Sequence, residues 1–425
     1  MALIVPAMMI GCQKPDTPQD DPTPEPPVEK PDTPVTPTPE PEIQLAPEIK
    51  SGDCVLAPNK YAEEFVKNVT YPDRDYTYSV ILDYHGGYNG QLAEGESVNG
   101  DKSSEYTIRW EANEAEGKLQ LELSEQETGW SMTKEITAGS NYVDINNLTP
   151  NVHYTYKVSS IDNGTVMTEG NFTTYGHIRQ VFFKTRVRNG RDMGGWLTYD
   201  GKMVKYHKIY RTGRWESGTM ANSGKKAMIA EGIKAQLDLR NTSDVLDAPA
   251  IEGMDFCAPL IETGGDSMLK AEKGDKTRQC MQFIIDCVKA DKPVVYHCSL
   301  GRDRTGTLGM IILGLLDVVE GDISKEYEVT YFSPRGWSIA SSETYKTFQN
   351  LRTTWAYKPA AEYIWAGKYP NATYEFNDDK ESPDYTPFSV RIEKYLLDIG
   401  ISQEDINTFR ELMLTEPYAD LTPAE

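Results

Sequence analysis

A strand, a loop and a helix are predicted between residues 293 and 316, and this stretch constrains the rest of the chain most strongly. The β-branched and aromatic run from Pro293 to His297 is typical of a buried strand, and the apolar run from Leu308 to Leu316 is typical of a buried helix. A loop between two such elements directs backbone N–H groups and the positive end of the helix toward its mouth. Its natural ligand is an anion, for which phosphate is the obvious candidate.

Two side chains of this loop, Cys298 and Arg304, have the chemistry needed to attack a phosphate group. The loop should bring this thiol and guanidinium to opposite sides of one oxyanion. Because a helix N-terminus and nearby cations lower the pKa of a thiol, we expect Cys298 to be a thiolate nucleophile at neutral pH. Arg304 can bind two phosphoryl oxygens at once, which a lysine cannot do.

The remaining loop residues have predicted supporting roles. Gly301 allows a tight turn with positive φ. His297 is expected to orient the loop rather than to act as a base, because a thiolate needs none. The Thr305 hydroxyl should reach the sulfur when it leaves a phosphocysteine. The residues predicted to surround the bound phosphate are Ser299, Leu300, Gly301, Arg302 and Arg304.

Three carboxylates are candidates for the acid that protonates the leaving oxygen. Asp303 is the nearest in sequence. Asp238 follows a predicted strand and could lie at the same sheet edge, where it would also contact substrate. Asp244 is a more distant candidate. Asp303 could instead cap the following helix or pair with Arg304, so the sequence leaves the choice open.

The run His297-Cys298-Ser299-Leu300-Gly301-Arg302-Asp303-Arg304-Thr305-Gly306, called the signature loop below, resembles the HCxxGxxRTG motif of cysteine-dependent phosphatases. It is most similar to the HCxAGKDRTG form of the bacterial tyrosine-phosphatase-like family, although Arg302 stands where that family often has Lys. Other segments resemble the same family over roughly residues 176–425. They are the N-x-R-D-x-G-G motif at 189–195, Tyr-Arg-Thr-Gly at 210–213, L-D-L-R at 237–240 and the closing helix pair around 395–402.

The resemblance implies phosphomonoester hydrolysis through a phosphocysteine, without metal or cofactor. The implied substrate is protein phosphotyrosine, joined in some members by phosphoserine, phosphothreonine or phosphoinositides. Arg302 with Asp303 suggests one alternative, a phosphatase for inositol polyphosphates or phosphoinositides. Another is a surface protein whose loop binds phosphate without turnover.

Arg191 and Asp192 are expected to form a buried ion pair that shapes the loop leading into the domain.

The chain is predicted to be multidomain. Residues 1–47 would be a signal remnant with a Pro-rich linker, and residues 48–175 an all-β sandwich. Residues 176–425 would be an α/β phosphatase domain whose central, mostly parallel sheet is flanked by helices. The period-two alternation that predicts the sandwich occurs at 106–110, 119–123 and 154–158. Residues 147–154 resemble the tyrosine-containing corner of fibronectin type III domains, with Trp110 in the place of their early core tryptophan.

Helices are expected at 223–231 and 277–290, and a strand at 235–239. Near the end of the chain, Gly400 can terminate one helix, and Ser402 with Asp405 can start the next through a capping box. The aromatic stretch from Tyr331 to Pro383, which contains Arg335 and Trp337, is either a structural insertion or a lid that faces substrate.

The apolar start Met1–Gly11 precedes Cys12, as in a bacterial lipobox. A lipid on Cys12 would attach the protein to the cell envelope on the extracytoplasmic side, and the Pro-rich tract to about Ala46 would act as an extended spacer. A basic segment before the apolar run is missing, so either the true start lies upstream or the export interpretation is wrong.

The formal net charge of −22 argues against nucleic acid as a partner and requires local fields to attract an anionic substrate.

The six cysteines show no disulfide framework, since Cys280 and Cys287 would lie about 10 Å apart along a helix. A reactive thiolate outside the cytoplasm predicts activity that depends on reductant. The isolated His85 and His153 do not suggest a metal site, and the sandwich is interpreted as a spacer or as a surface for an unknown partner.

Overall fold

The computed structural model describes residues 53–56, 60–68, 105–111, 117–183, 187, 189–215, 222–241, 247–332 and 357–418, all within the unit Pro47–Glu425. The predicted signal segment with Cys12, His85, Asp244, Arg335 and Trp337 lie outside the described residues. Within the described part, no helix has the length and hydropathy required to cross a membrane.

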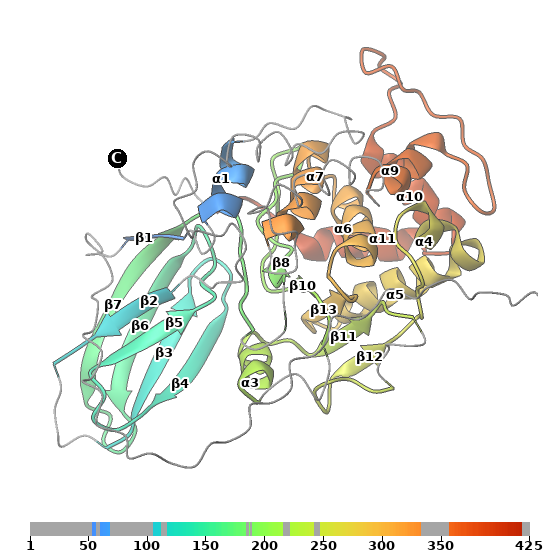
Figure 1. The fold of residues 1–425 in the computed structure, drawn as a ribbon. Coiled ribbons are helices and arrows are strands. Elements are labelled where there is room, and N and C mark those ends of the chain that lie inside the picture. Colours follow the sequence, from blue (N-terminus) through green and yellow to red (C-terminus); the bar gives the residue numbers. More distant parts are fainter. Residues whose placement is uncertain are drawn as a thin grey trace, which may run out of the picture. The chain divides into compact units, whose positions relative to one another are not determined.

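Two β-sheets that share one core form the first half of the described chain (Figure 1). The larger sheet has the order β1 (Asp53–Val55), β7 (Val166–Tyr175), β6 (His153–Ser160), β3 (Leu119–Glu125) and β4 (Ser131–Ile136), and the smaller pairs β2 (Glu105–Arg109) with β5 (Tyr142–Asn146). In β3 the buried Leu119, Leu121 and Leu123 alternate with more exposed residues, as the period-two pattern predicts. The three strands expected from this pattern all form.

A mixed sheet with mostly parallel strands lies at the centre of the second half. Its order is β12 (Asp255–Cys257), β11 (Ala235–Asp238), β13 (Val294–His297), β10 (Ile209–Thr212) and β8 (Arg191–Asp192). The first four strands are parallel and β8 is antiparallel to β10, so the expected mixed α/β architecture is present. A separate pair joins β9 (Met203–Val204) to β14 (Leu414–Thr415).

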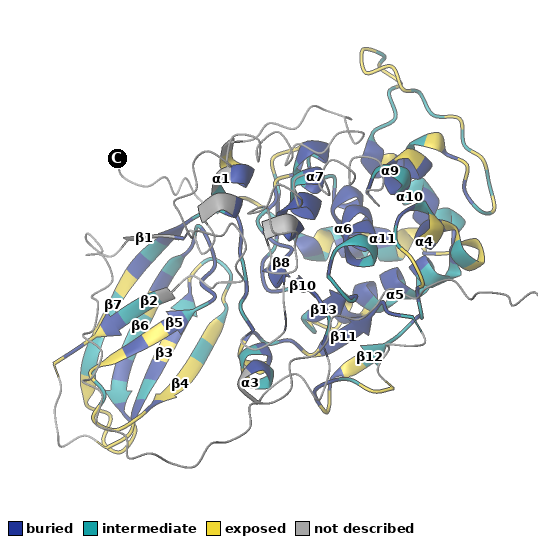
Figure 2. Ribbon diagram, viewed as in Figure 1, coloured by how far each residue is buried: buried dark blue, intermediate teal, exposed yellow. Residues whose placement is uncertain are grey.

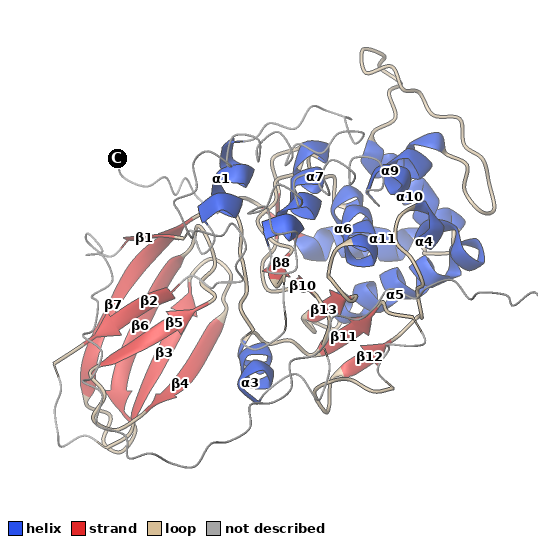
Figure 3. Cartoon of the chain, viewed as in Figure 1, coloured by secondary structure: helices blue, strands red, loops and turns tan. Residues whose placement is uncertain are grey.

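All residues of β11, β13, β10 and β8 are buried, whereas the edge strand β12 is partly exposed (Figure 2). Val294 and Tyr296 of β13 pack into the larger core, whereas Val295 packs with Trp215 and Met228 in a smaller core on the opposite face. Figure 3 shows the helices that accompany the sheet. They are α3 (Asn222–Ala230), α4 (Asp266–Lys270), α5 (Asp275–Lys289), α6 (Asp303–Leu315), α7 (Glu320–Glu328), α9 (Tyr357–Ala366), α10 (Phe388–Asp398) and α11 (Gln403–Met413), with the 3-10 turns η2 (Ala271–Gly274) and η3 (Val329–Phe332) and the earlier helix α1 (Lys60–Asn68).

The predicted elements agree with these bounds to within a few residues, with one informative exception. Helix α6 begins at Asp303 rather than at Leu308, so the second half of the signature loop forms the first turn of the helix. The predicted cap at Ser402 is present, since its hydroxyl accepts a hydrogen bond from the Asp405 N–H at 3.0 Å and donates one to the Asp405 carboxylate at 2.8 Å.

Buried polar contacts join the end of β3 to the segment before β10. The Glu125 carboxylate accepts hydrogen bonds from Tyr154 and Thr149, and its second oxygen lies 2.8 Å from His207 Nε2. Burial opposes ionisation of this carboxyl, but His207 outweighs it and lowers the pKa of Glu125 to about 2. Trp130 stacks on the His207 ring, with centroids 5.3 Å apart. The β-rich half therefore makes a specific contact with the α/β half.

Candidate active site

The signature loop lies where the central strand β13 ends and helix α6 begins. Parallel neighbours β11 and β10 flank β13, which places the loop at the carboxyl edge of the parallel strands. Gly301 has a φ of +68°, and a Cβ atom there would lie 2.5 Å from the backbone oxygen of Thr212. Only glycine fits both the left-handed conformation and this close approach to the end of β10.

Cys298 is the first residue after β13 and is 3% exposed. Burial disfavours its thiolate, but the charge of Arg304 and hydrogen bonds from Thr305 outweigh this effect and lower the pKa of Cys298 below its ordinary value. The Thr305 hydroxyl is buried and is one of the groups that lower the pKa of the neighbouring Cys298 thiol. The cysteine thus lies in surroundings that favour the nucleophilic form.

Arg304 spans the mouth of the loop from the first turn of α6. Its Nη1 donates to the carbonyl oxygens of Ile261, at 2.8 Å, and Leu239, at 3.3 Å. Nη2 lies 3.3 Å from the Ser299 hydroxyl. The residue is partly buried, and these hydrogen bonds hold its guanidinium beside Ser299 of the loop.

His297 is fully buried and lies behind the loop. Its Nε2 is 2.9 Å from the amide nitrogen of Gln236, and its ring stacks on Trp215 with centroids 5.4 Å apart. Burial lowers the pKa of His297 to about 4, in spite of the opposing effect of the Asp238 charge. A neutral, fixed imidazole fits the predicted role of orienting the loop.

Asp303 and Asp238 have contrasting surroundings. The Asp303 side chain is 38% exposed, pairs with Arg302 at 3.1 Å and accepts a hydrogen bond from the Tyr327 hydroxyl at 3.1 Å. Asp238 is completely buried and bound by Arg240, with the closest contact at 2.7 Å. Burial raises its pKa, but Arg240 and His297 more than compensate, and the pKa of Asp238 is lowered. An ionised, enclosed carboxylate is a poor proton donor and a poor substrate contact, which favours Asp303 for the acid role.

A sequence profile described as the tyrosine phosphatase family matches residues 184–415, more than half of the chain. The chain belongs to the tyrosine phosphatase family. A Cupriavidus necator protein whose name places it among the tyrosine-protein phosphatases is 24% identical over 164 residues, covering 33% of this chain and 59% of the relative. A tyrosine-protein phosphatase of Nostoc commune is 24% identical over 133 residues, covering 27% of this chain and 45% of the relative.

This member of the tyrosine phosphatase family therefore spans only about half the length of the curated relatives it matches. Crystal structures of Tk-PTP are 15% identical to it, cover 37% of this chain and at least 97% of their own, and superimpose with TM-scores of 0.23 and 0.22.

Arg191 and Asp192, in the family's N-x-R-D-x-G-G motif, are both buried, but the expected ion pair between them is not formed. Arg191 pairs with Glu326 at 2.9 Å, whereas Asp192 pairs with Arg179 at 2.9 Å. Adjacent residues of a strand point to opposite faces, and β8 follows this rule. The two adjacent charged residues of this motif therefore hold different segments, Arg191 the helix α7 and Asp192 the segment that contains Arg179.

Residues that support the signature loop from behind were not recognised from the sequence. Asn189 is the first residue of the N-x-R-D-x-G-G motif, which gives it no predicted role, and its positive φ of 56° fits an asparagine. Gln236 lies in the strand predicted at 235–239, but nothing there marks it as a partner of His297. Trp215, Glu326 and Tyr327 lie in segments with no distinguishing pattern, and the contacts of these four residues span up to 135 residues of chain. No signal in the sequence could have linked them to the loop.

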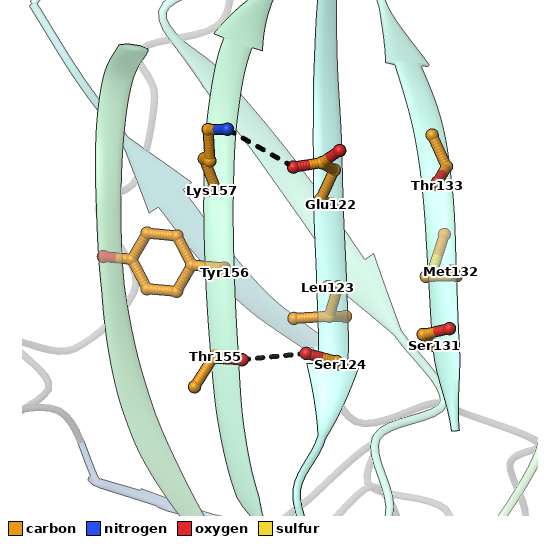
Figure 4. A pocket seen from close by; sticks show the side chains of 9 residues that line it. All are labelled: Glu122, Leu123, Ser124, Ser131, Met132, Thr133, Thr155, Tyr156 and Lys157. Atoms are coloured by element: carbon orange, nitrogen blue, oxygen red, sulfur yellow. Dashed lines mark hydrogen bonds and ion pairs between the residues drawn. The ribbon is translucent and has the colours of Figure 1, made fainter. Parts of the chain in front are cut away.

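Outside this site, the described residues contain no group of three His, Cys, Asp or Glu side chains that could hold a metal. His153 instead contacts Glu127. A polar hollow of about 470 Å³ lies over β3, β4 and β6 (Figure 4). Thr155 and Ser124 share a hydrogen bond of 2.8 Å there, and Lys157 lies 3.7 Å from Glu122.

Proposed function

We propose that this protein is a phosphomonoester hydrolase that acts through a phosphocysteine, with phosphotyrosine in proteins as its main substrate. The observation that carries the proposal is a thiol of lowered pKa at the end of β13, beside Arg304 and at the start of α6. This arrangement combines a nucleophile with a cation suited to the equatorial oxygens of a phosphoryl group. Family membership supports the same chemistry.

In the first step, the Cys298 thiolate attacks phosphorus, and the bond between phosphorus and the ester oxygen breaks. Arg304 stabilises the charge on the phosphoryl oxygens, and Asp303 donates a proton to the leaving oxygen. In the second step, water attacks the phosphocysteine while the Asp303 carboxylate takes up a proton from that water. The bond between sulfur and phosphorus breaks, which releases inorganic phosphate and the thiolate and restores the protonated Asp303. A hydrogen bond from the Thr305 hydroxyl stabilises the departing sulfur.

Replacement of the nucleophile tests the proposal directly. Wild type should release phosphate from a phosphotyrosine peptide with a burst of product, and Cys298→Ser should show no turnover while it still binds inorganic phosphate. Phosphate binding without turnover in wild type would instead identify a non-catalytic phosphate-recognising protein. A panel that adds phosphoserine peptides, phosphoinositides and inositol polyphosphates would define the substrate class. If Arg302 binds a second phosphate group, the inositol compounds should be hydrolysed faster than the phosphopeptides.

Asp303 can be tested separately as the general acid. Asp303→Asn should slow hydrolysis of phosphotyrosine far more than that of nitrophenyl phosphate, because nitrophenolate leaves without protonation. Asp238→Asn is the matched comparison. Equal slowing of both substrates by Asp303→Asn would assign the proton to another donor.

We also propose that residues 48–175 are a fibronectin type III-like sandwich module and that residues 1–47 carry a lipid anchor at Cys12 and a spacer. The Thr149 N–H donates to the Tyr154 hydroxyl at 2.8 Å in the corner segment, and Trp110 is 8% exposed in the sandwich core, in support of the first part. The polar hollow of Figure 4 is a candidate partner surface. Expression in bacteria with labelled palmitate should label the wild-type chain and not Cys12→Ala. Equal labelling of both would refute the anchor.

A further inference from the structure

The backbone of the signature loop is held by its carbonyl groups. Asn189 Nδ2 donates to the carbonyl oxygen of Gly301 at 2.9 Å and lies 3.4 Å from that of Leu300. Arg211 Nη2 donates to the same Gly301 oxygen at 2.5 Å. Arg211, a residue of β10, is completely buried. Two long-range donors thus fix two successive peptide groups.

This contact determines where the neighbouring N–H groups point. A trans peptide directs its C=O and its N–H in opposite directions, and the described residues contain no cis peptide. Because the carbonyls of Leu300 and Gly301 face Asn189 and Arg211, the N–H groups of Gly301 and Arg302 face away from those donors. Successive N–H groups with a shared direction make an anion-binding cradle.

Glu326 of α7 holds the donors in place. One carboxylate oxygen accepts a hydrogen bond from Arg211 Nη1, and the other accepts hydrogen bonds from Arg191, at 2.9 and 3.1 Å. Arg191 in turn donates to the Asn189 side-chain oxygen, so the Asn189 amide nitrogen faces the loop carbonyl of Gly301 and the Thr330 hydroxyl. Without this carboxylate, the two buried guanidinium groups would each lose the ion pair that they make with it.

We propose that Glu326 is a positioning residue for the signature loop. It holds Arg211 directly, and Asn189 through Arg191, against the loop carbonyls, and so aims the Gly301 and Arg302 N–H groups at the phosphoryl oxygens. Burial opposes ionisation of Glu326, but the two arginines keep its pKa below the ordinary value. As a role in hydrolysis, this inference rests on the proposed function, whereas the anion cradle can be tested without turnover.

The test compares Glu326→Gln with Glu231→Gln, each made in wild type and in Cys298→Ser. Glu231 is also a buried carboxylate, but it pairs with Arg179 at 2.8 Å and accepts a hydrogen bond from Tyr210. Calorimetry in the Cys298→Ser background measures binding of inorganic phosphate. Glu326→Gln should weaken phosphate binding at least tenfold and reduce kcat in the wild-type background, whereas Glu231→Gln should change neither more than twofold.

Iodoacetate alkylation as a function of pH provides a readout that general loss of structure would not reproduce. The pKa of Cys298 should change little in folded Glu326→Gln, because Arg304 and Thr305 remain in place. Phosphate binding and kcat that are unchanged in Glu326→Gln, or reduced equally in both Gln variants, would overturn the proposal.

Asn189→Gly provides a second test if Glu326→Gln does not fold. Glycine tolerates the φ of +56° and leaves the buried charges unchanged, while it removes the amide that holds Leu300 and Gly301. Phosphate should bind at least fivefold more weakly, and unchanged affinity would overturn the proposal. If wild type binds phosphate without turnover and Glu326→Gln weakens that binding, the proposed function fails and the positioning role of Glu326 in the anion cradle stands.

Discussion

The burial of His297 predicts a pH dependence of stability whose size follows from its environment. In the folded protein, burial lowers the pKa of this imidazole to about 4, compared with 6.5 for an exposed histidine. Each unit of difference is worth about 1.4 kcal/mol, so the full effect is about 3 kcal/mol. As the pH falls below 6.5, the unfolded chain takes up a proton that the folded protein does not bind until about pH 4. Stability should therefore decrease from pH 6.5 to 4 and show no contribution from His297 above that range.

The assay is urea unfolding of wild type and His297→Asn at pH 7, 6, 5 and 4. At pH 7 the variant should be less stable, since it lacks the ring that stacks on Trp215. This difference should shrink by about 3 kcal/mol toward pH 4, while titrating groups that do not contact His297 act equally in both proteins and cancel. Histidine ring signals in NMR spectra provide a direct check, because the chain has only five histidines. Stability curves that stay parallel from pH 7 to 4, or a His297 signal that titrates near 6.5, would refute the reasoning.

Three further predictions concern Glu125, Gly301 and Cys298. Glu125→Gln should remove about 3 kcal/mol of stability at pH 7, because the pKa of Glu125 is lowered from 4.5 to about 2; urea unfolding should show this difference disappear between pH 4.5 and 2, and a constant difference would contradict it. Gly301→Ala should reduce kcat at least a hundredfold while the far-ultraviolet circular dichroism spectrum stays unchanged, because backbone strain and the clash with Thr212 together cost about 3 kcal/mol. A variant that keeps a tenth of the wild-type kcat would contradict this prediction. Peroxide should inactivate the enzyme by oxidising Cys298 before Cys257, whose pKa is raised by burial, with phosphate protecting and reductant restoring activity; mass spectrometry that finds Cys257 oxidised first would count against this.

Much of the architecture could be predicted because its signals are local. A period of two reveals β3, and a cap at Ser402 marks the start of α11. The start of α6 was placed too late because the polar residues of its first turn break the apolar run by which a buried helix is recognised. Those same polar residues belong to the signature loop, so the boundary was hidden by the residues that carry the chemistry.

The candidate site was less accessible to sequence reasoning where roles depend on distant partners. The sequence favours Asp303 as the proton donor only slightly over its rival Asp238. The complete burial of Asp238 and its ion pair with Arg240 are what distinguish the two carboxylates. Adjacent charges at Arg191 and Asp192 suggested a mutual pair, although the alternation of a strand sends them to Glu326 and Arg179. Local patterns identify the groups, whereas tertiary contacts decide what each can do.

The carbonyl contacts behind the signature loop also bear on the order of folding. Asn189 reaches Gly301 across 112 residues, and Arg191 reaches Glu326 across 135. Contacts of such separation form late, because a long chain must be closed before they contribute stability. During synthesis, Cys298 emerges before α7. The contacts that hold the Leu300 and Gly301 carbonyls through Glu326 are therefore complete only after that helix has been made and has packed against the sheet.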